Sequence, residues 1–187
     1  MTTPRPTTPR IAPLPEAEWT DEQRALVEKT SNGVVVNIYT TVARYPLLGD
    51  RMTALGRALR SEPLSLRHRE ILILRTGWNC QSVYEFSQHR VLATEGGMTD
   101  DDLRRIIAGP DAPGWDPFEA ALARAADEMH ADCCISNETW AVLAARYDDR
   151  EVIQAVMLIG YYRLVSGLLN SLGVPVEGHA QGWSGLV

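Results

Sequence analysis

From Trp19 onward, apolar residues recur mainly at every third or fourth position, which is the period of a helix buried on one side. The residues Val34-Val35-Val36 come nearest to a strand, and they are too few to form one. Turn and breaker residues divide the chain into predicted helices, at residues 21–29, 37–44, 46–60, 66–78, 81–95, 100–107, 118–130, 136–146 and 150–172. The pattern therefore predicts a compact all-α fold.

Five polar residues mark predicted helix starts. Thr20, Ser65, Thr99, Asp116 and Ser136 each precede a segment with helical periodicity, and acidic residues follow several of them closely. Such side chains accept hydrogen bonds from the free N–H groups of a first helical turn, and acidic neighbours favour its partial positive charge. We therefore expect a helix to begin at each of these residues.

The first fifteen residues differ in composition from the rest of the chain. They contain five prolines among Thr and Arg residues. Segments of this kind are extended or disordered rather than part of a core. A chain of 187 residues is long enough for one apolar core and short for two. We predict a flexible Pro-rich arm over residues 1–15 and a single helical domain over residues 16–187.

Charge, hydropathy and cysteine content exclude several classes of protein. The net charge of −6 and the scattered arginines provide no basic surface for nucleic acid. Polar residues within 161–166 interrupt the most apolar segment, so no membrane span is predicted. Residues 1–10 lack the apolar stretch of a secretory leader, and Cys80, Cys133 and Cys134 do not form a disulfide framework. We expect a cytoplasmic protein with reduced thiols.

One polar stripe runs along the predicted helix 81–95. Ser82, Glu85 and His89 are spaced i, i+3 and i+7, so they share a face on which Glu85 and His89 can touch. Ser82 and His89 lie about 10 Å apart along the helix axis, which excludes a direct Ser–His nucleophile pair without a bridging group. Two interpretations stay open, an acid–base site or a solvated Glu–His pair beside a capping serine.

No motif in the sequence indicates a metal or a cofactor. The four histidines (His68, His89, His130 and His179) are scattered, and no HxxxH, HxH or CxxC pattern is present. The chain also contains no glycine-rich phosphate loop, no GxSxG elbow and no dinucleotide fingerprint. We therefore predict that neither a metal nor a cofactor is bound.

The segment from Glu70 to His89, EILILRTGWNCQSVYEFSQH, resembles the core motif of the carboxymuconolactone decarboxylase and alkylhydroperoxidase D superfamily. In the peroxidase branch, the motif is glutamate, eleven residues, cysteine, two residues, cysteine, three residues and histidine. The matching register here is Glu70, Ser82, Glu85 and His89.

Two further segments support the resemblance. Residues 37–39 ahead of residues 45–47 resemble the family's N-terminal helix pair, and residues 161–175 resemble the ending of its C-terminal helix. The resemblance covers roughly residues 15–178. It implies the compact helical fold of this superfamily and self-association into a trimer or a hexamer.

The sequence departs from the peroxidase motif at both redox positions, because Ser82 and Glu85 stand where that branch has cysteines. A dithiol peroxidase needs one thiolate to attack the peroxide and a second to resolve the product. The remaining groups are suited to acid–base chemistry. We interpret His89 as the general acid, Glu85 as the group that holds it, Glu70 as the group that sets its protonation state and Ser82 as a hydrogen-bond donor.

Five further residues are candidate substrate-binding groups. Tyr84 and Tyr39 are candidate hydrogen-bond donors, and Arg75 and Arg90 are candidate anchors for a substrate carboxylate. Cys80 completes the set. For each arginine a structural ion pair is the open alternative.

These residues favour an enzyme, a cofactor-independent lyase or isomerase of decarboxylase type that acts on a small acidic or lactone metabolite. In such a reaction carbon dioxide leaves and His89 protonates the resulting enolate. Two alternatives remain, a single-cysteine peroxidase-like antioxidant protein that uses Cys80, and a non-catalytic oligomeric binding protein of the same fold. The substrate cannot be read from the resemblance, because one scaffold of this kind hosts several chemistries.

Overall fold

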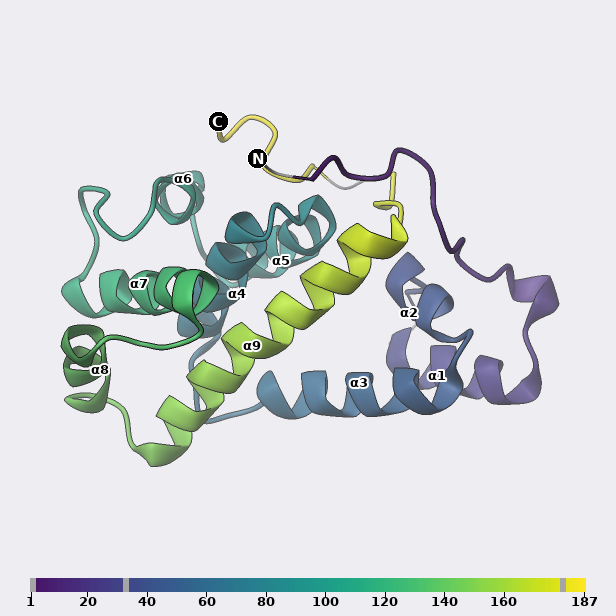
Figure 1. The fold of residues 1–187 in the computed structure, drawn as a ribbon, viewed down its shortest axis with the longest axis horizontal. Coiled ribbons are helices and arrows are strands. Elements are labelled where there is room, and N and C mark those ends of the chain that lie inside the picture. The colour runs from purple at the N-terminus through teal and green to yellow at the C-terminus, as the bar shows by residue number, and fades with distance from the viewer. Residues whose placement is uncertain (1–2, 32–33, 179–180) are drawn as a thin grey trace. The chain divides into compact units, whose positions relative to one another are not determined.

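The computed structural model describes residues 3–31, 34–178 and 181–187, and Figure 1 shows the chain as a ribbon. Within these ranges the chain forms helices and no strand, so the predicted all-α fold is confirmed. A short 3-10 turn, η1 (Glu16–Glu18), comes first. The helices that follow are α1 (Asp21–Ser31), α2 (Asn37–Val42), α3 (Pro46–Leu59), α4 (Leu66–Asn79), α5 (Val83–Glu95), α6 (Asp100–Ala108), α7 (Pro117–Asp132), α8 (Asn137–Ala144) and α9 (Asp149–Leu172).

The chain divides into two compact units. The first comprises Met1–Ala58 and Leu168–Ala180, and the second comprises Leu59–Gly167 and Gln181–Val187. The predicted single domain over residues 16–187 stays a prediction. The residues with candidate chemistry on α4 and α5 all lie in the second unit.

The first unit holds a small apolar core. Leu26, Val27 and Ala43 are buried there together. The predicted N-terminal arm contacts the end of α9, because the N–H of Arg10 donates a hydrogen bond to the carbonyl oxygen of Leu172 at 2.8 Å.

The second unit is built around α4, which packs against α5, α6 and α7 (Figure 1). Four consecutive residues of α4, Ile71–Leu74, are at most 1% exposed. A helix with one solvated side cannot bury four consecutive residues, so α4 is enclosed around its whole circumference. Polar side chains on α4 are therefore drawn into the core, and Glu70 is one of them.

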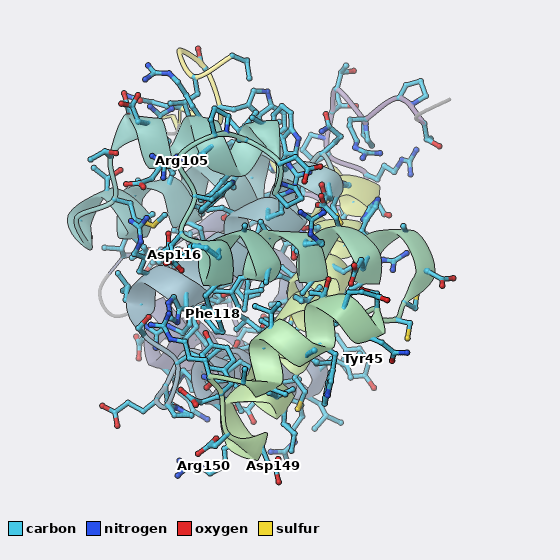
Figure 2. The ribbon with its side chains drawn as sticks, turned by 90° about the vertical axis from the view of Figure 1, so that its left-hand side faces the viewer. Tyr45, Arg105, Asp116, Phe118, Asp149 and Arg150 are labelled. Atoms are coloured by element: carbon cyan, nitrogen blue, oxygen red, sulfur yellow. The ribbon has the colours of Figure 1, made fainter. Side chains whose placement is uncertain are left out.

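The five predicted helix starts are confirmed by their capping hydrogen bonds. The side-chain oxygens of Thr20, Ser65, Thr99, Asp116 and Ser136 each accept a hydrogen bond from a backbone N–H in the first turn of the helix that follows. Figure 2 shows Asp116 at the beginning of α7. These local contacts satisfy N–H groups that have no partner inside the helix.

The predicted start of the helix at residue 81 is wrong by two residues. Gln81 has a φ of 51°, which lies in the left-handed region, so the chain turns there instead of entering a helix. Helix α5 begins at Val83, and Ser82 occupies the N-cap position. Ser82 therefore stands at the end of the polar stripe rather than within the helix.

Helix α9 is long and apolar. Among the described residues it is the helix whose length and hydropathy would suffice to cross a membrane, a property that core helices of soluble proteins share. Half of its most apolar window is buried against the rest of the chain. Its buried face carries Leu158, Tyr162 and Ser166, and this face contacts α5.

Candidate acid–base site

The turn between α4 and α5 brings two distant polar residues together. The reversal at Gln81 directs α5 back along α4, so Glu70 near the beginning of α4 lies beside His89 on α5. The two helices approach closely at Gly77, where an added Cβ would lie 3.6 Å from the backbone nitrogen of Phe86. An alanine would fit there in ordinary van der Waals contact, whereas a side chain that extends beyond Cβ would press the helices apart.

His89 lies between two carboxylates. Its Nδ1 is 2.7 Å from Oε2 of Glu70, and its Nε2 is 3.2 Å from Oε1 of Glu85. The three side chains are only 4%, 2% and 7% exposed, respectively. The structure thus brings Glu70, Glu85 and His89 into one buried cluster. The interpretation of Glu85 and His89 as a solvated surface pair does not fit this burial.

The electrostatics of this cluster favour a positively charged imidazole. Burial alone lowers the pKa of His89, but the charges of Glu70 and Glu85 and their hydrogen bonds outweigh it and raise the pKa to about 9. At neutral pH both ring nitrogens therefore carry protons, and both N–H groups donate to carboxylates. His89 is an imidazolium held in a site that bulk water scarcely reaches.

Tyr162 also contacts the cluster. It was not among the site residues predicted from the sequence. Its ring meets the ring of His89 edge to face, with 4.8 Å between the centroids. Arg60 donates a hydrogen bond from Nη1 to the Tyr162 hydroxyl oxygen at 3.2 Å. Burial raises the pKa of Tyr162, so the phenol keeps its proton and can donate it in a hydrogen bond.

Ser82 is fully buried, and its hydroxyl has no hydrogen-bond partner in the structure. Its N-cap position offers first-turn N–H groups, but the side chain does not bond to them. A buried hydroxyl without a partner lowers the stability of the fold, typically by about 1–3 kcal/mol. Ser82 is therefore available as a donor to a small bound molecule, but the structure does not bring it into contact with His89.

The two candidate arginines are engaged in contacts within the chain. Arg75 forms a two-pronged ion pair with Asp127, at 2.6 and 2.8 Å, and also donates to backbone carbonyls at the end of α6. Arg90 donates to the carbonyl oxygens of Gly182 and Ser184 at 3.1 Å each. These contacts fit arginines that stabilise the fold, which was the alternative to substrate binding. Substrate anchoring by either arginine stays a prediction.

Three candidates remain, on α5, on α2 and at the end of α4. Tyr84 is buried on α5, and Tyr39 belongs to α2 in the first unit. Cys80 caps the end of α4, where its Sγ is 3.8 Å from Nδ1 of His130. The described residues contain no group of three or more His, Cys, Asp or Glu side chains placed to hold a metal ion. His179 lies outside the described residues.

Comparison with known proteins identifies the superfamily. Residues 46–128 match the model of the carboxymuconolactone decarboxylase family, a span that includes Glu70, Ser82, Glu85 and His89. Over these residues the chain matches the carboxymuconolactone decarboxylase family, which supports the superfamily recognised from the sequence. The recognition made from the segment between Glu70 and His89 is thereby confirmed. Within this superfamily the chain carries Ser82 and Glu85 at the two positions that are cysteines in the peroxidase motif.

Several solved structures have a fold similar to that of this chain, and the proteins in them carry different functional names. An uncharacterised peroxidase-related protein from Silicibacter sp. TM1040 matches with a TM-score of 0.77 and 17% identity, over 97% of this chain and 98% of that one. An alkylhydroperoxidase AhpD core protein from Ralstonia eutropha JMP134 has a TM-score of 0.72 and 16% identity, over 90% and 93%. A cysteine-to-alanine variant of the debrominase Bmp8, in complex with 2,3,4-tribromopyrrole, has a TM-score of 0.77 and 12% identity, over 92% and 94%.

At such identities these structures establish the shared fold of the superfamily and no particular activity. None of the curated proteins matches the chain in sequence.

Proposed function

We propose that this superfamily member is a cofactor-independent lyase or isomerase that moves a proton at a carbon atom of a small acidic or lactone metabolite. The observation that carries the proposal is the imidazolium of His89, buried between Glu70 and Glu85 with a pKa of about 9. A buried and protonated imidazole is a ready proton source at neutral pH.

The two carboxylates take different roles because their contacts with His89 differ. The contact of Glu70 with Nδ1, at 2.7 Å, is the shorter one, and it orients the ring. The contact of Glu85 with Nε2, at 3.2 Å, is longer and is the one a substrate displaces. We therefore assign the Nε2 side to the substrate, and we assign Glu70 the role of a positioning residue.

For a β-keto or vinylogous acid, the reaction proceeds by loss of carbon dioxide. The electrons of the breaking C–C bond pass into the enolate, and the proton on Nε2 of His89 then transfers to carbon. Glu85, which lies one turn from His89 on the same helix, stabilises the imidazolium before the transfer and after its reprotonation. In an isomerisation the displaced Glu85 carboxylate removes the first proton and His89 supplies the second.

Tyr162 and Arg60 stabilise the negative charge of the enolate in this mechanism. The Tyr162 phenol keeps its proton, so its hydroxyl can donate to a developing oxyanion. Arg60 contacts that hydroxyl and brings a positive charge to it, and the charges of Glu70 and Glu85 act on the same phenol. This charge lowers the cost of placing an anionic substrate beside Glu70 and Glu85. Ser82 offers a further hydroxyl donor that is unused in the free protein.

The near-complete burial of the same side chains favours a second candidate function. In a member without catalytic activity, Glu70, Glu85 and His89 would form a structural network. Such a protein would act by binding a partner. The two candidates differ in one respect. A substrate must reach Nε2 of His89 in the enzyme, whereas a structural network stays closed.

Turnover in heavy water tests the proposal. Small β-keto acids, carboxylated lactones and their open-chain isomers are incubated with the protein, and deuterium incorporation at carbon and release of carbon dioxide are measured. We expect His89→Gln to lower the rate by about 10²- to 10⁴-fold, the usual contribution of a positioned acid or base. Glu85→Gln, a milder change, provides a second variant whose fold is checked by circular dichroism.

His68 supplies a matched control, because it is a half-buried histidine on α4 whose Nδ1 is hydrogen-bonded to the Tyr147 hydroxyl at 2.7 Å. His68→Gln is expected to leave turnover unchanged. Full activity in folded His89→Gln protein would refute the proposal. A complete lack of turnover across the panel would favour the non-catalytic candidate.

A further inference from the structure

Two buried hydroxyl groups lie on the two helices that contact each other at His89. Ser82 stands at the beginning of α5 and Ser166 lies on α9, and both residues are 0% exposed. Neither hydroxyl has a hydrogen-bond partner among the residues that the structure describes. A buried hydroxyl without a partner is unfavourable, so two of them on these helices require an explanation.

Ser166 does not make the local hydrogen bond that other hydroxyl side chains make within the helices of this chain. Thr53, Thr76 and Ser87 each donate to the carbonyl oxygen four residues earlier, at 2.8, 2.7 and 2.7 Å. The equivalent acceptor for Ser166 is the carbonyl oxygen of Tyr162, and the serine hydroxyl does not bond to it.

Ser82 likewise leaves a local partner unused. It occupies the N-cap of α5, but no backbone N–H of the first turn donates to its side chain. The five residues that start other helices, as described above, all accept such a hydrogen bond. The hydroxyl groups of Ser82 and Ser166 are therefore available to a partner outside their own helices.

The course of α9 follows from its contacts with the ends of other helices. Near the beginning of α9, Gln154 accepts a hydrogen bond from the N–H of Leu64, just ahead of α4. Further along, Arg163 donates to the carbonyl oxygen of Met129 near the end of α7, and the end of α7 contacts the end of α4. Helix α9 therefore runs from the beginning of α4 towards its end.

This course places the two serines on the same side of His89. Because the chain reverses after α4, α5 runs in the direction opposite to α9. Tyr162 contacts the ring of His89, and Ser166 lies one helical turn beyond Tyr162, towards the beginning of α5. Ser82 stands at that beginning, and Glu85 lies between it and His89. Both hydroxyls are thus on the side of the cluster that Glu85 occupies.

We propose that Ser82 and Ser166 form a subsite that binds an uncharged carbonyl oxygen of the substrate, that of a lactone or a ketone. A serine hydroxyl can rotate to donate its proton, and a carbonyl oxygen has two lone pairs to accept the two hydrogen bonds. Ser166, which was not among the site residues predicted from the sequence, is thereby assigned a role in substrate binding. The inference rests on the proposed lyase or isomerase function and specifies part of its substrate.

The charge of the cluster favours a carbonyl over a carboxylate at this subsite. Glu70 and Glu85 carry two negative charges against the single positive charge of His89. A carboxylate beside Glu85 would add to this excess in a buried site, whereas a carbonyl oxygen gains the hydrogen bonds without that penalty. The positive charge of Arg60 contacts the Tyr162 hydroxyl, so a negatively charged oxygen of the substrate is better placed there.

The first experiment compares two probes that differ in charge. γ-Valerolactone is uncharged, and 4-hydroxyvalerate is the anion formed when its ring opens. Ligand-observed NMR gives the dissociation constant of each, and the infrared spectrum of carbonyl-labelled lactone reports hydrogen bonds to its oxygen. We expect the lactone to bind at least about tenfold more tightly than the anion, with its carbonyl stretch at lower frequency when bound. Tighter binding of the anion, or no binding of the lactone, would overturn the proposal.

The second experiment tests Ser166 by two measurements that should change in opposite directions. Ser166→Ala should weaken lactone binding about threefold to tenfold, the usual effect of one lost hydrogen bond, and reduce the shift of the carbonyl stretch. The same change should raise the urea midpoint of the free protein, because it removes a buried hydroxyl that has no partner. A lower urea midpoint, or lactone binding equal to that of the wild-type protein, would contradict the role of Ser166.

Ser87→Ala is the matched control, because this buried serine on α5 has partners. Its hydroxyl donates to the carbonyl oxygen of Val83 at 2.7 Å and accepts from the N–H of Gly182 at 2.9 Å. The control should lower the urea midpoint and leave lactone binding unchanged. None of these measurements requires turnover, so failure of the subsite and failure of the lyase or isomerase proposal can be told apart.

Discussion

The pH dependence of stability follows directly from an imidazolium held between two carboxylates. The pKa of His89 is about 9 in the folded protein and about 6.5 in an unfolded chain. Because the folded-state pKa is the higher of the two, protonation of His89 stabilises the fold. This contribution is complete below pH 6.5 and is lost as the pH rises through 9.

The size of the effect follows from the two pKa values. At about 1.4 kcal/mol for each pKa unit, the free energy of unfolding should fall by roughly 3 kcal/mol between about pH 6 and pH 10. About two-thirds of this loss should lie between roughly pH 7 and pH 9. His89 is almost completely buried, so solvent screening does not reduce the effect greatly.

Urea unfolding, followed by far-UV circular dichroism at a series of pH values, measures this dependence. The matched control carries Glu70→Gln, Glu85→Gln and His89→Gln together, so it retains hydrogen-bonding side chains of similar size and has no titrating group in the cluster. The wild-type protein should lose roughly 3 kcal/mol more than this variant across the range. Parallel profiles for the two proteins would refute the reasoning.

Three further predictions concern single substitutions. Glu70→Gln should destabilise the protein by about 3 kcal/mol at neutral pH, because it leaves the buried charge of His89 with one partner fewer; urea unfolding measures the loss. Thr99→Ala should lower the free energy of unfolding by about 1 kcal/mol, because it removes a capping box at the start of α6; a difference below experimental error would contradict this role. The hydrogen bond from Arg67 holds the pKa of Asp102 well below its usual range. This pair therefore stabilises the fold above about pH 4, and the stabilisation is lost as the pH falls further. Arg67→Gln should therefore shift acid unfolding to higher pH, and an unshifted midpoint would argue against the pair.

The helices could be predicted because the forces that define them act over one or two turns. Apolar periodicity located the segments, and side chains such as Ser65 and Ser136 revealed where α4 and α8 begin. The start of α5 was misplaced because the left-handed conformation of Gln81 depends on the reversal between two packed helices. No local pattern in the sequence requires that conformation of a glutamine.

The candidate site was predictable where its contacts are local. Glu85 and His89 are four residues apart on one helix, so spacing alone predicted their contact. Glu70 is nineteen residues from His89, and only the family resemblance placed it in the site. The pairing of Arg75 with Asp127 spans 52 residues, which explains why the sequence could not separate a structural arginine from a substrate anchor.

Tyr162 was missed for a different reason. Helix α9 is apolar around most of its circumference, so its sequence does not distinguish the face that contacts His89 from the exposed face. Arg60 precedes α4 and contacts Tyr162 across 102 residues of chain. A tyrosine in a strongly apolar helix is as typical of a core position as of a site, and the family resemblance of residues 161–175 assigned Tyr162 no role.

The central claim is that His89 is an imidazolium at neutral pH. Nitrogen NMR of histidine-labelled protein tests it directly, with the His89 signals assigned by comparison with His89→Gln. We predict protons on both ring nitrogens at pH 7 and a titration midpoint near 9. A ring with one unprotonated nitrogen at pH 7, or a midpoint at or below about 6.5, would contradict the account.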